Sequence, residues 1–372
     1  MTRILHILPR VPPAVCGIGD YAWGIARKLR DEHGIHSSFL AAGTTWTQPV
    51  GETEFPAFRL PELTAKALVE DVAARKEELG AVVLHLSPYG FQKRGVPLWL
   101  ASGWRQLSQM PSRPRLITMF HELYATGSLR SSAFWLQPLQ KWVLRRVARA
   151  SDGLRTNRQG YAEWLEGISG LKTASVDVMP VYSNFCEPEV LPSWNEREAA
   201  MALFCWGIHS GESLETVVRK AVAHCQRFGL RRLHLIGCKQ ELDPVQSHVE
   251  YVRHEFLEAP ALTRLLSSCR MAYTAYSPAH FGKSTLMAAF AAHGLVVITQ
   301  GRTNVLPDGL QDGVNALNES SLLMVETTGV EQVEKIGTAL RQWYDRHSLD
   351  RHAQSYAAQI KRLVASSVSS FP

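Results

Sequence analysis

Short apolar runs alternate with longer amphipathic stretches along most of the chain. The short runs predict strands buried on both faces, because a parallel sheet covered by helices leaves few strand positions in contact with water. The longer stretches carry apolar residues at helical spacing. In the first half, strands are predicted over residues 3–8, 36–42, 81–87, 115–120, 153–157 and 176–181, and helices over residues 21–32, 63–79, 97–107 and 134–150. This alternation indicates a doubly wound α/β domain.

The alternation is interrupted near the middle of the chain. Residues 181–197 contain two prolines and several polar residues, a composition typical of an interdomain linker. A second alternation follows, which predicts another α/β domain. Its strands are predicted over residues 202–207, 233–237, 271–276 and 295–299, and its helices over residues 212–228, 261–268, 283–293 and 330–364.

The sequence thus predicts an α/β protein of two Rossmann-like domains that face each other across a cleft. We place the first domain over residues 1–185, a linker over 186–199 and the second domain over 200–350. A last helix, residues 351–372, closes the second domain, and packing back on the first is a further option. Ligands of such sheets bind beyond the carboxyl ends of the strands, so the loops there are the candidate sites.

Composition narrows the class of protein. The chain has 372 residues, of which 45% are apolar and 20% charged, which excludes a disordered chain and suits two globular domains. Forty Lys and Arg against 34 Asp and Glu give a net charge of +6. With a pI of about 9.0, this balance leaves nucleic acid, an anionic membrane surface and an anionic substrate open as partners.

Cysteine spacing and apolar run lengths bear on the compartment. The six cysteines form no CxxC pair, so a structural zinc site is not expected and nothing demands an oxidising environment. The first apolar run ends at Pro9 and is too short for a signal peptide. No run approaches the roughly 18 apolar residues that a membrane-spanning helix needs. We expect a cytoplasmic protein.

The first candidate site is the loop over residues 9–20, between the first predicted strand and helix. Gly17 and Gly19 would allow the backbone to approach a ligand, and Asp20 would cap a helix that starts at Tyr21. The third glycine of the dinucleotide fingerprint is missing, so a nicotinamide cofactor is not indicated. An ordinary strand-to-helix turn with a capping aspartate is the alternative.

The second candidate is the pair His121 and Glu122, directly after the predicted strand 115–120. Their place at the carboxyl end of a strand is the functional edge of such a sheet. His121 could donate a hydrogen bond to a substrate hydroxyl or carry a proton, or it could merely satisfy a loop carbonyl. A metalloprotease helix is excluded, because Ala125 stands where the HExxH pattern needs its second histidine.

The third candidate follows the predicted strand 271–276. Gly282 allows a tight turn, and Lys283, Ser284 and Thr285 are expected in the first turn of the next helix. Free N–H groups, the helix dipole, a lysine and two hydroxyls form a site suited to phosphate. A P-loop is not matched, because Ser277 stands where its first glycine should be. A capped helix with a solvated lysine is the alternative.

The loop over residues 206–213 is a fourth candidate. It contains Gly207 and His209 and leads from a predicted strand into a helix, at the same kind of sheet edge. An ordinary loop, with Ser210 or Gly211 near the helix cap, explains it equally well. Arginine and tryptophan gather over residues 142–150, where one amphipathic helix with solvated arginines fits better than a nucleic-acid stripe.

Taken in order, these segments resemble bacterial glycosyltransferases of the GT-B fold, above all the retaining, nucleotide-sugar-dependent enzymes of family 4. In the first half the resemblance rests on PPAVCGIGDYAWGIARKLRDEHGI, VVLHLSPYGFQKRGVP, LITMFHELYATG and VMPVYSNFCEP. In the second half it rests on ALFCWGIHSGESLETVV, and on FGKSTLMAAFAAHGLVVIT followed by LQDGVNAL. It covers most of the chain, and the order of the segments carries more weight than any one of them.

The resemblance implies a role for each candidate. It makes the first domain the acceptor side and the second the nucleotide-sugar-binding side. Gly17 and Gly19 would lie against donor phosphate and acceptor, His121 would contact the sugar near the reacting carbon, and the helix from Lys283 would hold the diphosphate. The implied reaction moves a sugar to an acceptor hydroxyl with retention. Neither a metal nor a cofactor beyond the nucleotide-diphosphate sugar is implied.

The chain departs from the family around the diphosphate-binding helix and also at the start of the second domain, where GIHSGES lacks the usual Arg and Lys. The family usually places two glutamates around the diphosphate-binding helix, and here Ala279 and Met287 stand in their places. A non-catalytic sugar- or nucleotide-binding relative and an epimerase of the same fold are therefore the alternatives. The expected partners are a nucleotide sugar and a hydroxyl acceptor, with no nucleic acid. Contact with an anionic membrane surface is a further option.

Overall fold

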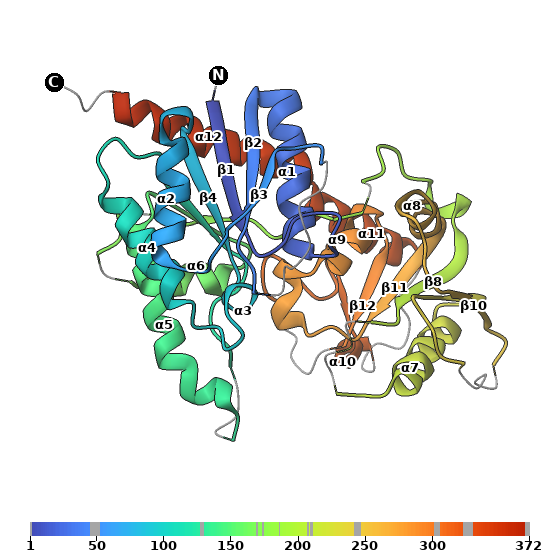
Figure 1. The fold of residues 1–372 in the computed structure, drawn as a ribbon. Coiled ribbons are helices and arrows are strands. Elements are labelled where there is room, and N and C mark those ends of the chain that lie inside the picture. Colours follow the sequence, from blue (N-terminus) through green and yellow to red (C-terminus); the bar gives the residue numbers. More distant parts are fainter. Residues whose placement is uncertain are drawn as a thin grey trace. The chain divides into compact units, whose positions relative to one another are not determined.

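The computed structural model divides into two compact units (Figure 1). It describes residues 2–44, 53–126, 130–168, 170–172, 175–185, 187–206, 208, 211–241, 247–300, 306–322 and 330–368. Unit 1 comprises Met1–Met179 together with Leu349–Pro372, and unit 2 comprises Pro180–Ser348. The chain therefore passes from unit 1 to unit 2 after Met179 and returns to unit 1 after Ser348.

Unit 1 is built on a seven-stranded parallel sheet with the order β3-β2-β1-β4-β5-β6-β7. The strands are β1 (Thr2–Leu8), β2 (Ile35–Ala41), β3 (Ala57–Arg59), β4 (Ala81–Leu86), β5 (Arg115–Phe120), β6 (Gly153–Thr156) and β7 (Asp177–Val178). The helices are α1 (Gly17–His33), α2 (Ala65–Arg75), α3 (Pro88–Phe91), α4 (Leu98–Gln109), α5 (Ser132–Ala150), α6 (Gln159–Glu166) and α12 (Leu349–Val368), and a 3₁₀ turn, η1 (Lys76–Glu78), follows α2.

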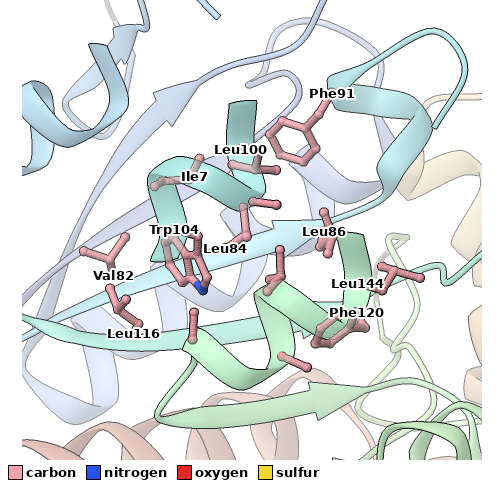
Figure 2. Close-up of a cluster of buried hydrophobic side chains, with 14 of the residues drawn as sticks. Ile7, Val82, Leu84, Leu86, Phe91, Leu100, Trp104, Leu116, Phe120 and Leu144 are labelled. Carbon is pink, nitrogen blue, oxygen red and sulfur yellow. The ribbon is translucent and has the colours of Figure 1, made fainter. Parts of the chain in front are cut away.

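Alternation along the central strands decides which face each side chain meets. Val82, Leu84 and Leu86 of β4 point to the face covered by α2, α4 and α5, where they form the main core (Figure 2). Trp104 of α4 is fully buried there, and its Nε1–H donates to the Ser151 hydroxyl at 3.0 Å. The intervening residues of β4, His85 among them, point to the opposite face. Helices α1 and α12 pack against each other.

Unit 2 is built on a six-stranded parallel sheet with the order β10-β9-β8-β11-β12-β13. The strands are β8 (Glu198–Phe204), β9 (Arg232–Ile236), β10 (Glu250–His254), β11 (Cys269–Thr274), β12 (Val296–Thr299) and β13 (Leu317–Asn318). The helices are α7 (Leu214–Arg227), α8 (Ala259–Ser268), α9 (Thr285–Ala292), α10 (Glu319–Leu322) and α11 (Val330–Asp345), with 3₁₀ turns η2 (Trp194–Glu196) and η3 (Pro278–Lys283).

The predicted fold class is confirmed, because both units are parallel sheets covered by helices. Several details differ, among them the following. Residues 330–364 were predicted as one helical segment, but they contain two helices, α11 and α12, with a break between Asp345 and Leu349. Strand β8 begins at Glu198, before the predicted 202, and β7 covers only two residues of the predicted 176–181. Within the described residues, no helix is long and apolar enough to cross a membrane.

Candidate functional site

His121 lies where sequence reasoning placed it, at the carboxyl ends of the central strands of unit 1. It follows β5 directly, and its backbone N–H donates to the carbonyl of Leu86, the last residue of β4, at 2.9 Å. The Asn157 side-chain amide, just past β6, donates to the His121 carbonyl at 3.2 Å. Three neighbouring strand ends therefore fix the backbone that carries this histidine.

The His121 side chain ends a row of hydrogen-bonded histidines that crosses the sheet. Its Nε2 lies 3.1 Å from Nδ1 of His85, and Nε2 of His85 lies 2.9 Å from Nδ1 of His6. Nε2 of His6 then lies 3.2 Å from the Ser37 hydroxyl. Because β2, β1, β4 and β5 are successive neighbours in the sheet, the row, Ser37–His6–His85–His121, runs across the strands and not along one of them.

Burial keeps this row neutral. It lowers the pKa of His6 and of His121 to about 3, and it lowers that of His85 well below its ordinary value. The positive charge of Arg155 lowers the pKa of His85 further, whereas the carboxylate of Glu122 opposes the effect at His121. Neutral imidazoles carry one N–H each, so every link holds one proton and the whole row donates in one of two directions.

The row leaves one ring nitrogen of His121 for chemistry. Within the described part of the chain, no hydrogen bond to its Nδ1 occurs, and the residue keeps 6% of its surface exposed. If the row donates away from His121, Nδ1 is a base; if it donates toward His121, Nδ1 carries the proton. A proton taken up at Nδ1 can leave through Nε2 to His85, so the row can pass a proton without any ring becoming a stable cation.

Two helices enclose the histidine row from the face opposite the main core. The Tyr21 ring of α1 meets the His121 ring edge-on, with ring centroids 5.0 Å apart. Its hydroxyl lies 3.0 Å from Nδ1 of His352 on α12. Glu122, next to His121, accepts a hydrogen bond from the Ser87 hydroxyl at 2.8 Å. The two residues predicted together, His121 and Glu122, thus have separate partners on the same edge.

The glycine loop differs from its prediction. Helix α1 begins at Gly17, with Cys16 as its N-cap residue, so Asp20 lies in the first turn and is not the cap. The prediction was wrong because glycines are tolerated in a first helical turn, where few N–H groups have intrahelical partners. Gly19 has a specific role: a Cβ there would lie 2.7 Å from the Arg10 carbonyl oxygen, so the preceding loop needs a glycine for its close approach.

The predicted phosphate site in unit 2 also has a different local structure. Lys283 ends the 3₁₀ turn η3, Ser284 is the N-cap of α9 and Thr285 is the first helical residue, so the three do not share a first turn as predicted. A 3₁₀ turn forms first because Pro278 suits its start. The Ser284 hydroxyl accepts the Met287 N–H at 3.2 Å.

This geometry decides which donors the site offers an anion. The N–H groups of Thr285 and Leu286 open α9 and have no intrahelical partner, and Lys283 lies two residues before Thr285. One nearby donor is already used, because the Gly282 N–H donates to the Asp308 carboxylate at 3.2 Å. The start of α9 therefore combines the helix dipole, two backbone N–H groups and the nearby Lys283 with one carboxylate, that of Asp308.

The other predicted residues of unit 2 are less informative. Gly207, His209 and Ser210 lie outside the described residues. At the positions of the two family glutamates, Ala279 is exposed and Met287 is only 1% exposed, inside the core. A carboxylate at the second position would be buried, which costs free energy unless a hydrogen-bonding or charged group meets it.

Sequence reasoning missed a polar cluster near the carboxyl ends of the unit 2 strands. Glu212, just before α7, accepts from the Gln300 amide after β12 at 2.6 Å and pairs with Lys220 at 2.9 Å. Glu319, just after β13, accepts from the Tyr273 hydroxyl at 3.4 Å and lies 3.3 Å from Nε2 of His224. The residues are far apart in sequence and match no motif, so no signal pointed to them.

The described residues also bear on metal binding and on a cavity in unit 1. Among the residues that the structure describes, no three His, Cys, Asp or Glu side chains gather so as to hold a metal ion. A cavity of about 840 Å³ in unit 1 lies at the amino ends of β1 and β2, and Ser37 lines it. Its arginines are paired with carboxylates, for example Arg3 with Glu78 at 2.6 Å, so the cavity has little net positive charge to attract an anion.

Comparison with known proteins establishes the fold. No protein-family model and no curated protein matches the chain. TarM aligns with a TM-score of 0.60 and 8% identity, over 98% of this chain and 99% of that chain. A Listeria monocytogenes protein named as a UDP-N-acetylglucosamine 2-epimerase aligns with a TM-score of 0.59 and 13% identity, over 100% and 97%. An α-glucosyltransferase in complex with UDP and DNA aligns with a TM-score of 0.54 and 9% identity, over 96% and 98%.

Likeness at these identities shows architecture alone. The chain has the two-domain GT-B fold, and units 1 and 2 are its two Rossmann-like domains. Solved structures that share this fold with it include glycosyltransferases and 2-epimerase-like proteins.

Proposed function

We propose that the protein is a glycosyltransferase that moves a sugar from a nucleotide-diphosphate sugar to an acceptor hydroxyl, with retention at the reacting carbon. The observation that carries this proposal is the start of α9, where a helix N-terminus and Lys283 follow the carboxyl end of β11 in a GT-B fold. Two of the structures with this fold, an α-glucosyltransferase and MnaA from S. aureus, were determined with UDP bound. The same class of ligand suits the anion site described above.

In this proposal unit 2 binds the diphosphate and unit 1 contacts the sugar. The N–H groups at the start of α9 and the Lys283 ammonium stabilise the leaving diphosphate, whose charge grows as the sugar departs. His121 lies against the sugar and uses its Nδ1 as a hydrogen-bonding group. We expect neither a metal nor a cofactor beyond the donor, because the helix dipole and the lysine already meet the diphosphate charge.

An epimerase of the same fold is the second candidate. It is favoured by the Listeria protein named as a UDP-N-acetylglucosamine 2-epimerase and by the histidine row. Epimerisation next to a carbonyl or enol ether carbon requires a proton to leave and to return, and a neutral row that passes protons suits that task. A non-catalytic nucleotide-binding relative is the third, because Ala279 and Met287 replace the family glutamates.

A binding titration separates these candidates from an unrelated function. We would titrate the full chain by calorimetry with UDP, ADP, GDP and dTDP, and then with the corresponding sugars. If the protein is a glycosyltransferase, an epimerase or a non-catalytic relative, it should bind at least one of these nucleoside diphosphates. Incubation of the bound nucleotide sugar without acceptor then releases an altered sugar only from an epimerase. The absence of any nucleotide binding would refute all three.

Variants of one residue test the role of the anion site. Lys283→Ala removes a charged hydrogen bond worth about 1.5–3 kcal/mol, so the diphosphate affinity should fall roughly tenfold to a hundredfold. Lys335→Ala is the matched control, since Lys335 is an exposed lysine of α11 paired with Glu331. Equal affinities for Lys283→Ala and the control would remove Lys283 from the site.

A further inference from the structure

The positive charge of the chain is concentrated in one stretch of unit 1. Between Glu78 and Asp152 the sequence holds ten Lys and Arg residues and a single carboxylate, Glu122. That excess is larger than the net charge of +6 of the entire chain, so the remainder is slightly acidic. Helix α5 lies wholly within this stretch and has no acidic residue.

Helix α5 also carries large apolar side chains in contact with water. Trp135 is 72% exposed, Trp142 is 43% exposed and Leu139 is 41% exposed. Their spacing of four and three residues places them on one face of the helix, over about 10 Å of its length. Arg145 and Arg149 are exposed on the same face one and two turns further on. We call these five residues the α5 surface.

The opposite face of α5 is fully used within unit 1. Val143, Leu144, Val147 and Ala148 are buried in the main core, and Figure 2 shows Leu144 beside Phe120. The helix therefore cannot turn its tryptophans inward. Its N-terminal half extends beyond the sheet and the other helices of unit 1 (Figure 1). An apolar cluster on such a projecting element marks a contact surface.

The chemistry of the α5 surface selects its partner. A second copy of the chain would bring two positive faces together, which is unfavourable. A single-stranded nucleic acid would need aromatic rings in a groove that tracks its backbone, whereas these rings stand on a convex helix with Leu139 between them. Tryptophan and leucine beside arginine on a helix surface match the boundary between acyl chains and anionic headgroups.

We propose that the α5 surface docks the protein on a bilayer that contains anionic lipids. Trp135, Leu139 and Trp142 enter the headgroup boundary, and Arg145 and Arg149 contact lipid phosphates. The helix lies on the membrane and does not cross it, in keeping with the finding that no described helix is long and apolar enough to do so.

This surface also bears on the acceptor. Strand β5 ends at Phe120, His121 follows it, and α5 starts at Ser132, so the N-terminal end of α5 belongs to the same edge of the sheet as His121. A docked enzyme would meet an acceptor hydroxyl carried by a lipid in that membrane. Only this last step rests on the proposed function; the docking itself does not depend on what the enzyme transfers.

Vesicle binding tests the proposal directly. The full chain is sedimented with vesicles of phosphatidylcholine alone and of phosphatidylcholine with 30% phosphatidylglycerol. We expect binding to the anionic vesicles that weakens as salt rises, and little binding to the neutral ones. Equal binding to both vesicles, or none to either, would overturn the proposal.

Paired variants assign the binding to the α5 surface. Trp135→Ser with Trp142→Ser should lower the affinity for anionic vesicles at least tenfold, and Phe256→Ser, an 80% exposed residue of unit 2, should not. Arg145→Gln with Arg149→Gln should lower it roughly fivefold for each charge, and Arg264→Gln on α8 is the control. All changes are at exposed positions, and matching thermal unfolding confirms intact folds.

Two further results would contradict the assignment. Undiminished vesicle binding by both α5 variants would place the contact elsewhere. Tighter binding of a single-stranded 20-mer oligonucleotide than of anionic vesicles, lost in the same variants, would make the α5 surface a nucleic-acid site. Because neither assay uses a nucleotide sugar, failure of the docking proposal leaves the proposed function untouched, and the reverse holds as well.

Discussion

Acidification from pH 7 to pH 5 should destabilise unit 1 strongly, because its histidine row is buried in the neutral form. In the fold, burial lowers the pKa of His6 and His121 from the ordinary 6.5 to about 3. The unfolded chain therefore binds protons below pH 6.5 that the folded chain does not accept until near pH 3. Protonation then favours unfolding over that whole window, and stability returns as the pH rises above 6.5.

The size of this effect follows from the two pKa values of each residue. Between pH 7 and pH 5 one such histidine costs about 2 kcal/mol of unfolding free energy, so His6 and His121 together cost about 4 kcal/mol. His85 adds a loss of the same sign, since burial and the nearby Arg155 also lower its pKa. That sum is a large fraction of the unfolding free energy of a typical domain, which is about 5–15 kcal/mol.

Hydrogen-exchange mass spectrometry in urea at pH 7, 6 and 5 measures this loss. Peptides from β1, β4 and β5 report on unit 1 separately from unit 2, once exchange rates are corrected for pH. His6→Phe should reduce the pH-dependent loss by about 2 kcal/mol, whereas His36→Gln, at a histidine outside the row, should not change it. An unfolding free energy in β1 and β4 that is the same at pH 7 and pH 5 would refute the burial of neutral histidines.

Three substitutions test other parts of the account. Arg155→Met removes a guanidinium that is 2% exposed, pairs with the Asp177 carboxylate and donates hydrogen bonds to α12. The unfolding free energy should fall by about 3–5 kcal/mol, and limited proteolysis should cut α12. An uncleaved α12 would contradict this. Gly19→Ala places a Cβ 2.7 Å from the Arg10 carbonyl oxygen. It should lower the unfolding free energy of unit 1 by about 1–3 kcal/mol, measured by urea denaturation. An unchanged urea midpoint would show that the loop moves to make room. Ser284→Ala removes the N-cap of α9 and should cost about 1 kcal/mol, and equal stability of Ser284→Ala and wild type would mean that another acceptor serves the Met287 N–H.

The strands buried on both faces are those whose bounds the sequence predicted best. Central strands such as β1, β4 and β5 are continuous apolar runs, and their predicted bounds agree with the structure to within about a residue. The strands without a prediction, β3, β10 and β13, all lie at sheet edges. Edge strands are short or half-exposed, as in β10 with the sequence EYVRH, so they lack the apolar run on which the prediction depends.

The candidate site was predictable only where it follows a strand directly. His121 was found because it stands right after an apolar run, and the sheet then fixes its place. Its link to His6 and His85 could not be foreseen, because it depends on which strands become neighbours in the sheet. A histidine inside an otherwise apolar strand was the only signal at either position.

Local conformation at the helix starts was beyond the sequence pattern as well. Residues 17–20 were interpreted as a loop because of two glycines, yet the first helical turn accepts both. Lys283 and Ser284 were expected inside one helix, but a 3₁₀ turn that starts at Pro278 takes up the chain before α9. Such starts are decided by the loops that pack against them, here through the Asp308 carboxylate on the Gly282 N–H.

A crystal structure with the tightest-binding nucleoside diphosphate would show whether the start of α9 is the anion site. We expect the diphosphate oxygens within hydrogen-bond distance of the N–H groups of Thr285 and Leu286, with the Lys283 ammonium beside them. A diphosphate bound at any other place on the protein, with the start of α9 untouched, would contradict this assignment.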